Sequence, residues 1–454
     1  MTIDLPASRQ FAAWLSAFNS GRQAEMLTYH EANFPYDKAS ADVAGIDREL
    51  GLSQFTGGFE FKRAEESAAT GIVAILKERD SDQFARAAMD VDAEPPHHVL
   101  KFEIHPIPTP DDLRPCRMEE RDAIVALVTE VDRAMQRDWF SGAVLIAKNG
   151  QAVFAEAFGF ADRAAKLPNT LNTRFRIASI NKMFTAVAVM RLVQARALAL
   201  TDPLGTILTD YPNDNVASKV TIHHLLTHTG GTGSIYTPDY AARRLELRTH
   251  ADYVKLLGTR DVAFEPGAKF EYSNYGFLLL GAIIEKVTRT SYYDAVEELV
   301  YRPAGMMATG SLPEEDMVPD RAIGYTRDTL QDPWKSNVET LPYRGTANGG
   351  GYSTVTDLLA FANALTMCRL LDQTHTRVLT TGKVACGDAV QYAYGFEECI
   401  EGGIRRVGHP GGGPGSNGEL SICDSGYTVV VLANMDPPCA QRLVRFITGR
   451  LPVK

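Results

Sequence analysis

A serine and a lysine three residues apart, Ser179 and Lys182, form the single S-x-x-K pattern in the chain. Apolar residues follow at helical spacing, among them Met183, Val187 and Met190, so Ser179 should open a helix with a buried face. Ser179 and Lys182 would then lie on one face, with the Ser179 amide among the unpaired N–H groups that favour an oxyanion. A nucleophilic serine needs such a neighbouring base. An N-cap serine with a solvated lysine is the alternative that the pattern alone leaves open.

A second polar segment, Tyr272-Ser273-Asn274, follows a Pro-Gly turn and precedes an amphipathic helical pattern. Another Y-x-N match begins at Tyr211, but its central Pro212 indicates a loop.

A third segment, His409-Pro410-Gly411-Gly412, lies in a glycine-rich run near the C-terminus. Pro410 lacks an N–H, which is tolerated on an edge strand but not inside a sheet. Glycines here would let a substrate approach the backbone, whereas the alternative is a flexible surface loop.

These three segments, in this order, resemble the motifs of the serine β-lactamases, the penicillin-binding proteins and their esterase relatives, over about residues 120–450. The resemblance implies that Ser179 is the nucleophile and that Lys182 and Tyr272 handle its protons. It also implies that Asn274 holds a substrate carbonyl or orients Lys182.

His409 and Pro410 stand where the resemblance places the lysine and threonine of a K-T-G motif, on an edge strand. This departure weakens recognition of an anionic β-lactam. Gly411 would admit the substrate, and the Gly412 N–H is the expected second donor to the oxyanion.

The resemblance implies a serine hydrolase that works through an acyl-enzyme and needs no cofactor. We expect a carboxylesterase acting on small esters, with weak or no β-lactamase activity. A D-amino-acid amidase or peptidase, a β-lactamase, and an inactive β-lactamase-like binding module are the alternatives. The expected partner is a small-molecule ester or amide.

No metal site is expected. His224 and His228 have the i,i+4 spacing of a helical zinc pair, but Leu225 occupies the place of the glutamate in H-E-x-x-H. The six cysteines form no C-x-x-C pair, which is typical of reduced, separately packed thiols.

Charge and hydropathy exclude several partners. The net charge is −10 and no dense Lys/Arg run occurs, so neither nucleic acid nor an anionic membrane is expected. The first residues lack a basic, apolar secretory pattern, and no eighteen-residue apolar window is present. A cytoplasmic location is the resulting expectation.

The motifs require a sheet beside helices, and both ends of the larger region supply strand patterns. The predicted fold class is α+β: a β-lactamase-like antiparallel sheet flanked by helices, plus a helical subdomain. Asn149-Gly150 predicts a hairpin. The predicted strands are residues 141–147, 151–159, 404–407, 419–423 and 427–432, and the flanking helices are residues 119–136 and 440–448.

A separate small α+β domain is expected over residues 1–112, with the hydrolase domain over 116–454 and a proline-rich linker at 106–115. The order of elements resembles the nuclear-transport-factor-2-like (NTF2-like) superfamily, whose curved sheets commonly pair, so a homodimer is compatible with it. The predicted helices are residues 6–19 and 22–30, followed by a loop and strands at 58–66, 70–78, 83–92 and 98–107.

Overall fold

The computed structural model describes residues 5–34 and 43–453, and for residues 43 and 44 only the backbone. Its contacts divide the chain into two compact units. The first comprises residues 1–116 with 327–333, and the second comprises 117–326 with 334–454. The segment 327–333 therefore departs from the predicted boundary, because it lies within the expected hydrolase region yet belongs to the first unit.

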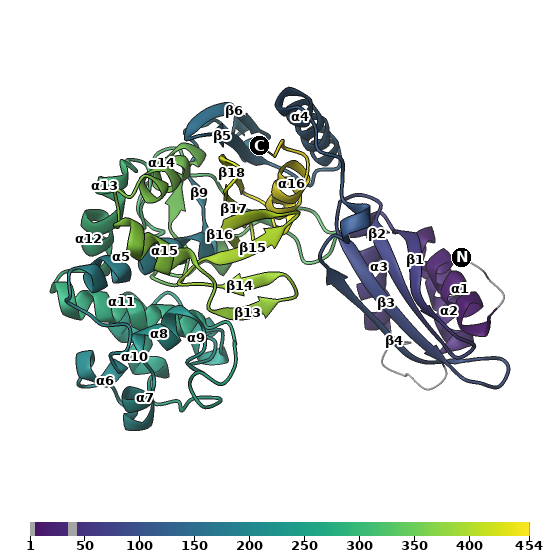
Figure 1. Cartoon of the computed structure of the whole chain (residues 1–454), viewed down its shortest axis with the longest axis horizontal. Coiled ribbons are helices and arrows are strands. Elements are labelled where there is room, and N and C mark those ends of the chain that lie inside the picture. The colour runs from purple at the N-terminus through teal and green to yellow at the C-terminus, as the bar shows by residue number, and fades with distance from the viewer. Residues whose placement is uncertain (1–4, 35–42, 454) are drawn as a thin grey trace. The chain divides into compact units, whose positions relative to one another are not determined.

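The first unit packs helices against a four-stranded antiparallel meander in the order β1-β2-β3-β4 (Figure 1). Phe11, Trp14 and Phe18 lie on one helix face and are buried in its core. The NTF2-like resemblance stays a prediction. The elements of this unit are α1 (Pro6–Ser20), α2 (Gln23–Asn33), α3 (Val43–Thr56), β1 (Phe59–Ser67), β2 (Gly71–Glu78), β3 (Phe84–Val91) and β4 (Val99–Ile107).

One prediction for this unit was wrong. Helix α3 replaces part of the expected loop, because Ile46 is buried in the core and Ser53 Oγ donates to the Phe18 carbonyl, while two glycines obscure the helical pattern. The segment predicted as a linker, residues 106–115, begins with the end of β4 at Ile107 and contains a 3-10 turn at Asp111–Leu113.

The second unit is built on an eight-stranded antiparallel sheet in the order β13-β14-β15-β16-β17-β18-β5-β6. The Asn149-Gly150 hairpin is present between β5 and β6. The α+β class is confirmed. The strands are β5 (Gly142–Lys148), β6 (Gln151–Phe158), β13 (Val384–Gly387), β14 (Val390–Tyr392), β15 (Glu397–Glu401), β16 (Ile404–Gly413), β17 (Ser416–Cys423) and β18 (Tyr427–Ala433).

Alternating side chains of this sheet enter two different cores. On one face, Val144, Val429 and Val431 pack with α4 (Glu120–Gln136) and α16 (Cys439–Thr448). On the other, Leu145, Val430 and Leu432 join the core that contains the central helix α5 (Asn181–Gln194). Figure 1 shows the sheet between these two helical layers.

The helical layer around α5 consists mostly of short elements between residues 204 and 380 (Figure 1). Among the described residues, no helix combines the length and the apolar character needed to cross a membrane. The remaining helices are α6 (Leu204–Ile207), α7 (Asp214–Lys219), α8 (Ile222–Leu226), α9 (Pro238–Arg243), α10 (His250–Leu257), α11 (Asn274–Thr288), α12 (Tyr292–Val296), α13 (Arg302–Ala304), α14 (Val355–Thr366) and α15 (Gln373–Thr380). Short strand pairs complete the unit: β7 (Phe160–Asp162) with β8 (Leu167–Pro168), β9 (Phe175–Arg176) with β12 (Tyr352–Ser353), and β10 (Tyr325–Thr326) with β11 (Lys335–Ser336).

The expected edge strand at His409 was wrong, because β16 lies inside the sheet between β15 and β17. Pairing with β15 ends at Gly408, whereas pairing with β17 continues to Gly413. Pro410 therefore lies on the part of the strand that has one paired neighbour, where its missing N–H breaks no ladder bond on the β15 side. The glycine-rich run is strand rather than loop.

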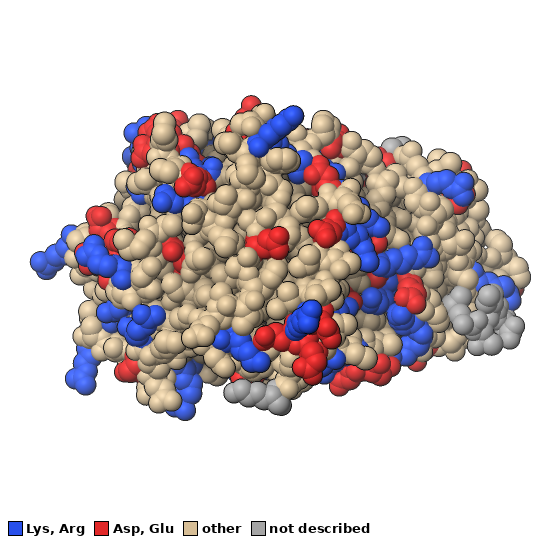
Figure 2. Space-filling model, turned by 90° about the horizontal axis from the view of Figure 1, so that it is seen from above, with Lys and Arg blue, Asp and Glu red and all other residues tan. Residues whose placement is uncertain are grey.

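Charged side chains of both signs are intermixed on the face shown in Figure 2. The predictions of no nucleic-acid partner and no membrane partner stay predictions.

Candidate active site

Ser179 lies in a 3-10 turn, Ala178–Ile180, that leads directly into α5. The preceding Ala178 has φ +46°, a conformation rare for residues with a Cβ and common where a functional group is held in place. This turn leaves Ser179 partly exposed while Lys182, one turn later, is completely buried. The Lys182 Nζ atom lies 3.1 Å from Ser179 Oγ.

Lys182 has two further partners, both carbonyl oxygens. Its Nζ donates to Asn274 Oδ1 at 2.8 Å and to the main-chain oxygen of Asn348. Burial holds the pKa of Lys182 well below its usual range, which favours the neutral amine. A neutral amine has two hydrogens and one lone pair. With both hydrogens taken by oxygens that can only accept, the lone pair is left for the Ser179 hydroxyl.

Tyr272 lies next to Lys182, and its ring centroid is 4.7 Å from Lys182 Nζ. The residue remains 38% exposed. Burial around the phenol raises the pKa of Tyr272 above its usual value. The phenol is therefore protonated at neutral pH and suited to passing a proton on.

His228 fixes the backbone on both sides of Tyr272. Its carbonyl accepts from the Glu271 N–H at 2.9 Å and its Nδ1 accepts from the Ser273 N–H at 3.0 Å. The ring packs 4.2 Å from the Tyr272 ring and is 1% exposed. Burial, together with the nearby Lys182, lowers the pKa of His228 well below its usual value. The two histidines at i,i+4 thus hold local backbone in place. His228 fixes the segment around Tyr272, and His224 forms a capping box with Thr221 at the start of α8.

His409 is buried within the sheet and exposes 2% of its surface. Its Nδ1 donates to the Pro410 carbonyl at 2.5 Å, and its Nε2 lies 3.1 Å from the Tyr392 hydroxyl, which then donates to it. Burial and, secondarily, Lys182 lower the pKa of His409 to about 3. His409 therefore contributes no positive charge to the site at neutral pH.

Gly411 brings β16 against the turn that carries Ser179. A Cβ on Gly411 would lie 2.2 Å from the Ile177 carbonyl oxygen, so a side chain there would push the strand away from that turn. A Cβ on Gly412 would lie 2.7 Å from Pro437 Cγ. The structure thus places Gly411 beside the turn of Ser179 and Gly412 next along the same strand.

The sequence interpretation missed Asn348, whose carbonyl meets Lys182. It lies in a loop of consecutive glycines, in which Gly350 N–H donates to the Ala178 carbonyl at 3.2 Å. A Cβ on Gly349 would lie 3.4 Å from the Ala178 carbonyl carbon. The run Asn348-Gly349-Gly350-Gly351 was the available signal, since adjacent glycines mark close backbone approach.

A sheet between two helical layers, with a serine, a buried lysine and a tyrosine meeting at the start of the central helix, defines a hydrolase of the β-lactamase fold. The family model described as Beta-lactamase matches residues 127–450, and the chain belongs to this family.

Three relatives illustrate its range. Penicillin-binding protein 4* of Bacillus subtilis (strain 168) is 29% identical over 324 residues, which cover 66% of this chain and 69% of that protein. Esterase EstB of Burkholderia gladioli is 35% identical over 205 residues, which cover 41% of this chain and 52% of that protein. The crystal structure of a penicillin binding protein from Bacillus halodurans superposes with a TM-score of 0.64 at 32% identity, covering 71% of this chain and 98% of that one.

Proposed function

We propose that the chain is a carboxylesterase that hydrolyses small esters through an acyl-enzyme on Ser179. The observation that carries this proposal is the set of three contacts around Lys182 Nζ: Ser179 Oγ and two oxygens that can only accept. This arrangement turns the lone pair of a neutral amine toward the serine hydroxyl, which is the geometry of a general base.

In the proposed cycle, Lys182 takes the Ser179 proton as Oγ attacks the ester carbonyl carbon. The N–H groups of Ser179 and Gly412 stabilise the resulting oxyanion. Tyr272, which is protonated and lies beside Lys182, passes a proton to the departing alkoxide and is reprotonated by Lys182. Water then attacks the acyl-enzyme along the same proton path, releasing the acid and restoring Ser179.

The preference for neutral esters over anionic β-lactams rests on His409. A cation there would attract the carboxylate of a β-lactam, but His409 is uncharged and its two ring nitrogens already face Pro410 and Tyr392. The esterase among the relatives supports the same preference.

The test is a panel of p-nitrophenyl esters, a chromogenic cephalosporin and a D-aminoacyl anilide, assayed on the wild type and on Ser179→Ala. We expect the esters to be the best substrates and Ser179→Ala to abolish their turnover. A phosphonate probe should add its mass at Ser179 alone. Faster anilide cleavage would favour an amidase, and phosphonate labelling that persists in Ser179→Ala would refute Ser179 as the nucleophile.

A further inference from the structure

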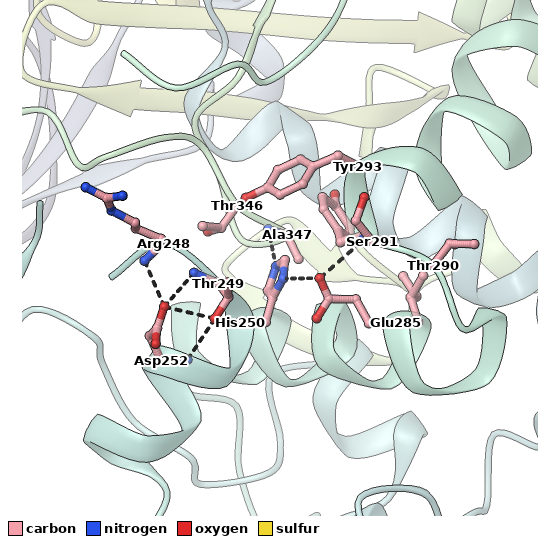
Figure 3. Close-up of polar contacts among 12 residues, drawn as sticks. Arg248, Thr249, His250, Asp252, Glu285, Thr290, Ser291, Tyr293, Thr346 and Ala347 are labelled. Carbon is pink, nitrogen blue, oxygen red and sulfur yellow. Dashed lines mark hydrogen bonds and ion pairs between the residues drawn. The ribbon is translucent and has the colours of Figure 1, made fainter. Parts of the chain in front are cut away.

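A buried histidine and a partly exposed glutamate lie in the helical layer, outside the groups that the proposed cycle uses (Figure 3). His250, the first residue of α10, is completely buried, and its Nδ1 lies 3.1 Å from Glu285 Oε1 on α11. The same Glu285 oxygen accepts from the Tyr292 N–H at 3.1 Å. Burial raises the pKa of Glu285, but the hydrogen bonds from His250 and from the Tyr292 N–H outweigh it and leave the pKa lowered. Glu285 is therefore an anchored carboxylate that accepts from His250.

The hydrogen bonds of His250 determine its tautomer. Its Nε2 accepts from the main-chain N–H of Ala347 at 3.3 Å, so the proton must lie on Nδ1, where it is donated to Glu285. Figure 3 shows the ring between the carboxylate and the Ala347 amide. Gly281 leaves room for this arrangement, because a Cβ there would lie 2.4 Å from His250 Nε2 and 2.7 Å from Ala347 Cβ.

Ala347 directly precedes Asn348, whose carbonyl accepts from Lys182. The start of α5 holds the carbonyls of this loop: Asn181 Nδ2 donates to Thr346 O at 2.9 Å, and Thr185 Oγ1 donates to Ala347 O at 2.7 Å. The Ala347 N–H is held from the opposite direction by His250. The Thr346–Ala347 peptide group is thus fixed by hydrogen bonds at both its carbonyl and its N–H, and the following Ala347 carbonyl is held as well.

We propose that His250 and Glu285 are positioning residues that hold the loop of residues 346–348, so that the Asn348 carbonyl meets Lys182 and leaves its lone pair directed at Ser179. This inference rests on the proposed role of Lys182 as base. Loss of the His250 contact lets the Asn348 carbonyl move, and the amine then loses a fixed acceptor. Serine activation suffers, while the substrate-contacting surface is unchanged.

The test compares His250→Gln with His250→Asn in the full chain. Gln can place an amide oxygen where Nε2 accepts from Ala347, whereas Asn is one methylene too short. We expect His250→Asn to lower kcat for a p-nitrophenyl ester about tenfold with KM within twofold, and His250→Gln to restore most of the loss. Leu257→Ala, a cavity on the same helix, is the control: it should lower the melting temperature yet leave kcat within twofold.

Equal kcat values for folded His250→Asn and the wild type would overturn the proposal, as would equal losses in the Asn and Gln variants. If His250→Asn does not fold, Gly281→Ala separates His250 from Ala347 instead, and an unchanged kcat in that variant overturns the proposal too. Failure of the proposed function is distinct, because the wild type itself would then neither turn over esters nor take up the phosphonate at Ser179.

Discussion

Lys182 and His409 are both buried basic side chains in the second unit, and burial lowers the pKa of each. Their lone pairs nevertheless face different groups. The two carbonyl partners of Lys182 leave its lone pair for Ser179, whereas the free nitrogen of His409 already accepts from the Tyr392 hydroxyl. Desolvation therefore supplies a neutral base in both places, and the surrounding donors and acceptors decide which of them can take a proton from a substrate-facing group.

Among the changes that test the difference between Lys182 and His409, removal of Lys182 or of its partner Tyr272 should have the largest effect on kcat. Lys182→Ala and Tyr272→Phe should each lower kcat at least about 10²-fold, because in the proposed cycle both groups transfer the same protons. The double variant should be little worse than either single one, since residues that act as a unit are not additive. Steady-state kinetics with one ester measures all three.

The matched control is His409→Gln, which keeps an acceptor for Tyr392 and should cost less than about fivefold in kcat. Losses that multiply cleanly in the Lys182/Tyr272 double variant would show that the two residues do not share a proton path.

The pH dependence of acylation sharpens the same comparison. The folded-state pKa of Lys182 lies well below its unfolded value, so the neutral amine persists to lower pH than in an ordinary lysine and is lost as the pH falls through the lowered value. The value of kcat/KM for an uncharged ester should thus be level above that lowered pKa and fall below it. An acid limb near 10.5, the ordinary lysine value, would contradict a desolvated base.

A smaller effect is expected from placing a positive charge at residue 409. His409→Lys should raise cephalosporin kcat/KM relative to that for a neutral ester by about tenfold, or about 1.4 kcal/mol, through attraction to the substrate carboxylate. The measurement is the ratio of the two rates in the folded variant, with His409→Gln as the uncharged control. An unchanged ratio would place His409 away from the substrate carboxylate.

The smallest effect on chemistry is expected from removing the first unit. Ser179, Lys182, Tyr272, Asn348 and His409 all belong to the second unit. A chain that starts at residue 117 should therefore label Ser179 with the phosphonate at nearly the wild-type rate, as followed by mass spectrometry. Circular dichroism and light scattering check its folding and size. A folded truncation without labelling would show that the first unit completes the site.

Local patterns predicted much of the fold because their causes are local. The strands of the first unit begin and end within one or two residues of the predicted bounds. Successive side chains of a strand point to opposite faces, so alternating apolar residues bounded by turn residues indicate a strand from the local sequence alone. The same holds for the hairpin at Asn149-Gly150 and for the one-turn spacing of Ser179 and Lys182. Helix α3 was missed because tertiary packing of Ile46 outweighs its weak local pattern.

The sequence by itself determined the order of the three motifs and the one-turn spacing of Ser179 and Lys182, and its resemblance to the serine β-lactamases predicted Ser179, Lys182 and Tyr272 as nucleophile, base and proton carrier. Tertiary structure alone decided the direction of the lysine lone pair, because one of its acceptors is the main-chain carbonyl of Asn348, 166 residues away. It also decided that His409 is uncharged, through its burial beneath Tyr392. A carbonyl oxygen occurs in every residue and leaves no mark in the sequence, so only the folded chain shows which one a buried amine will find.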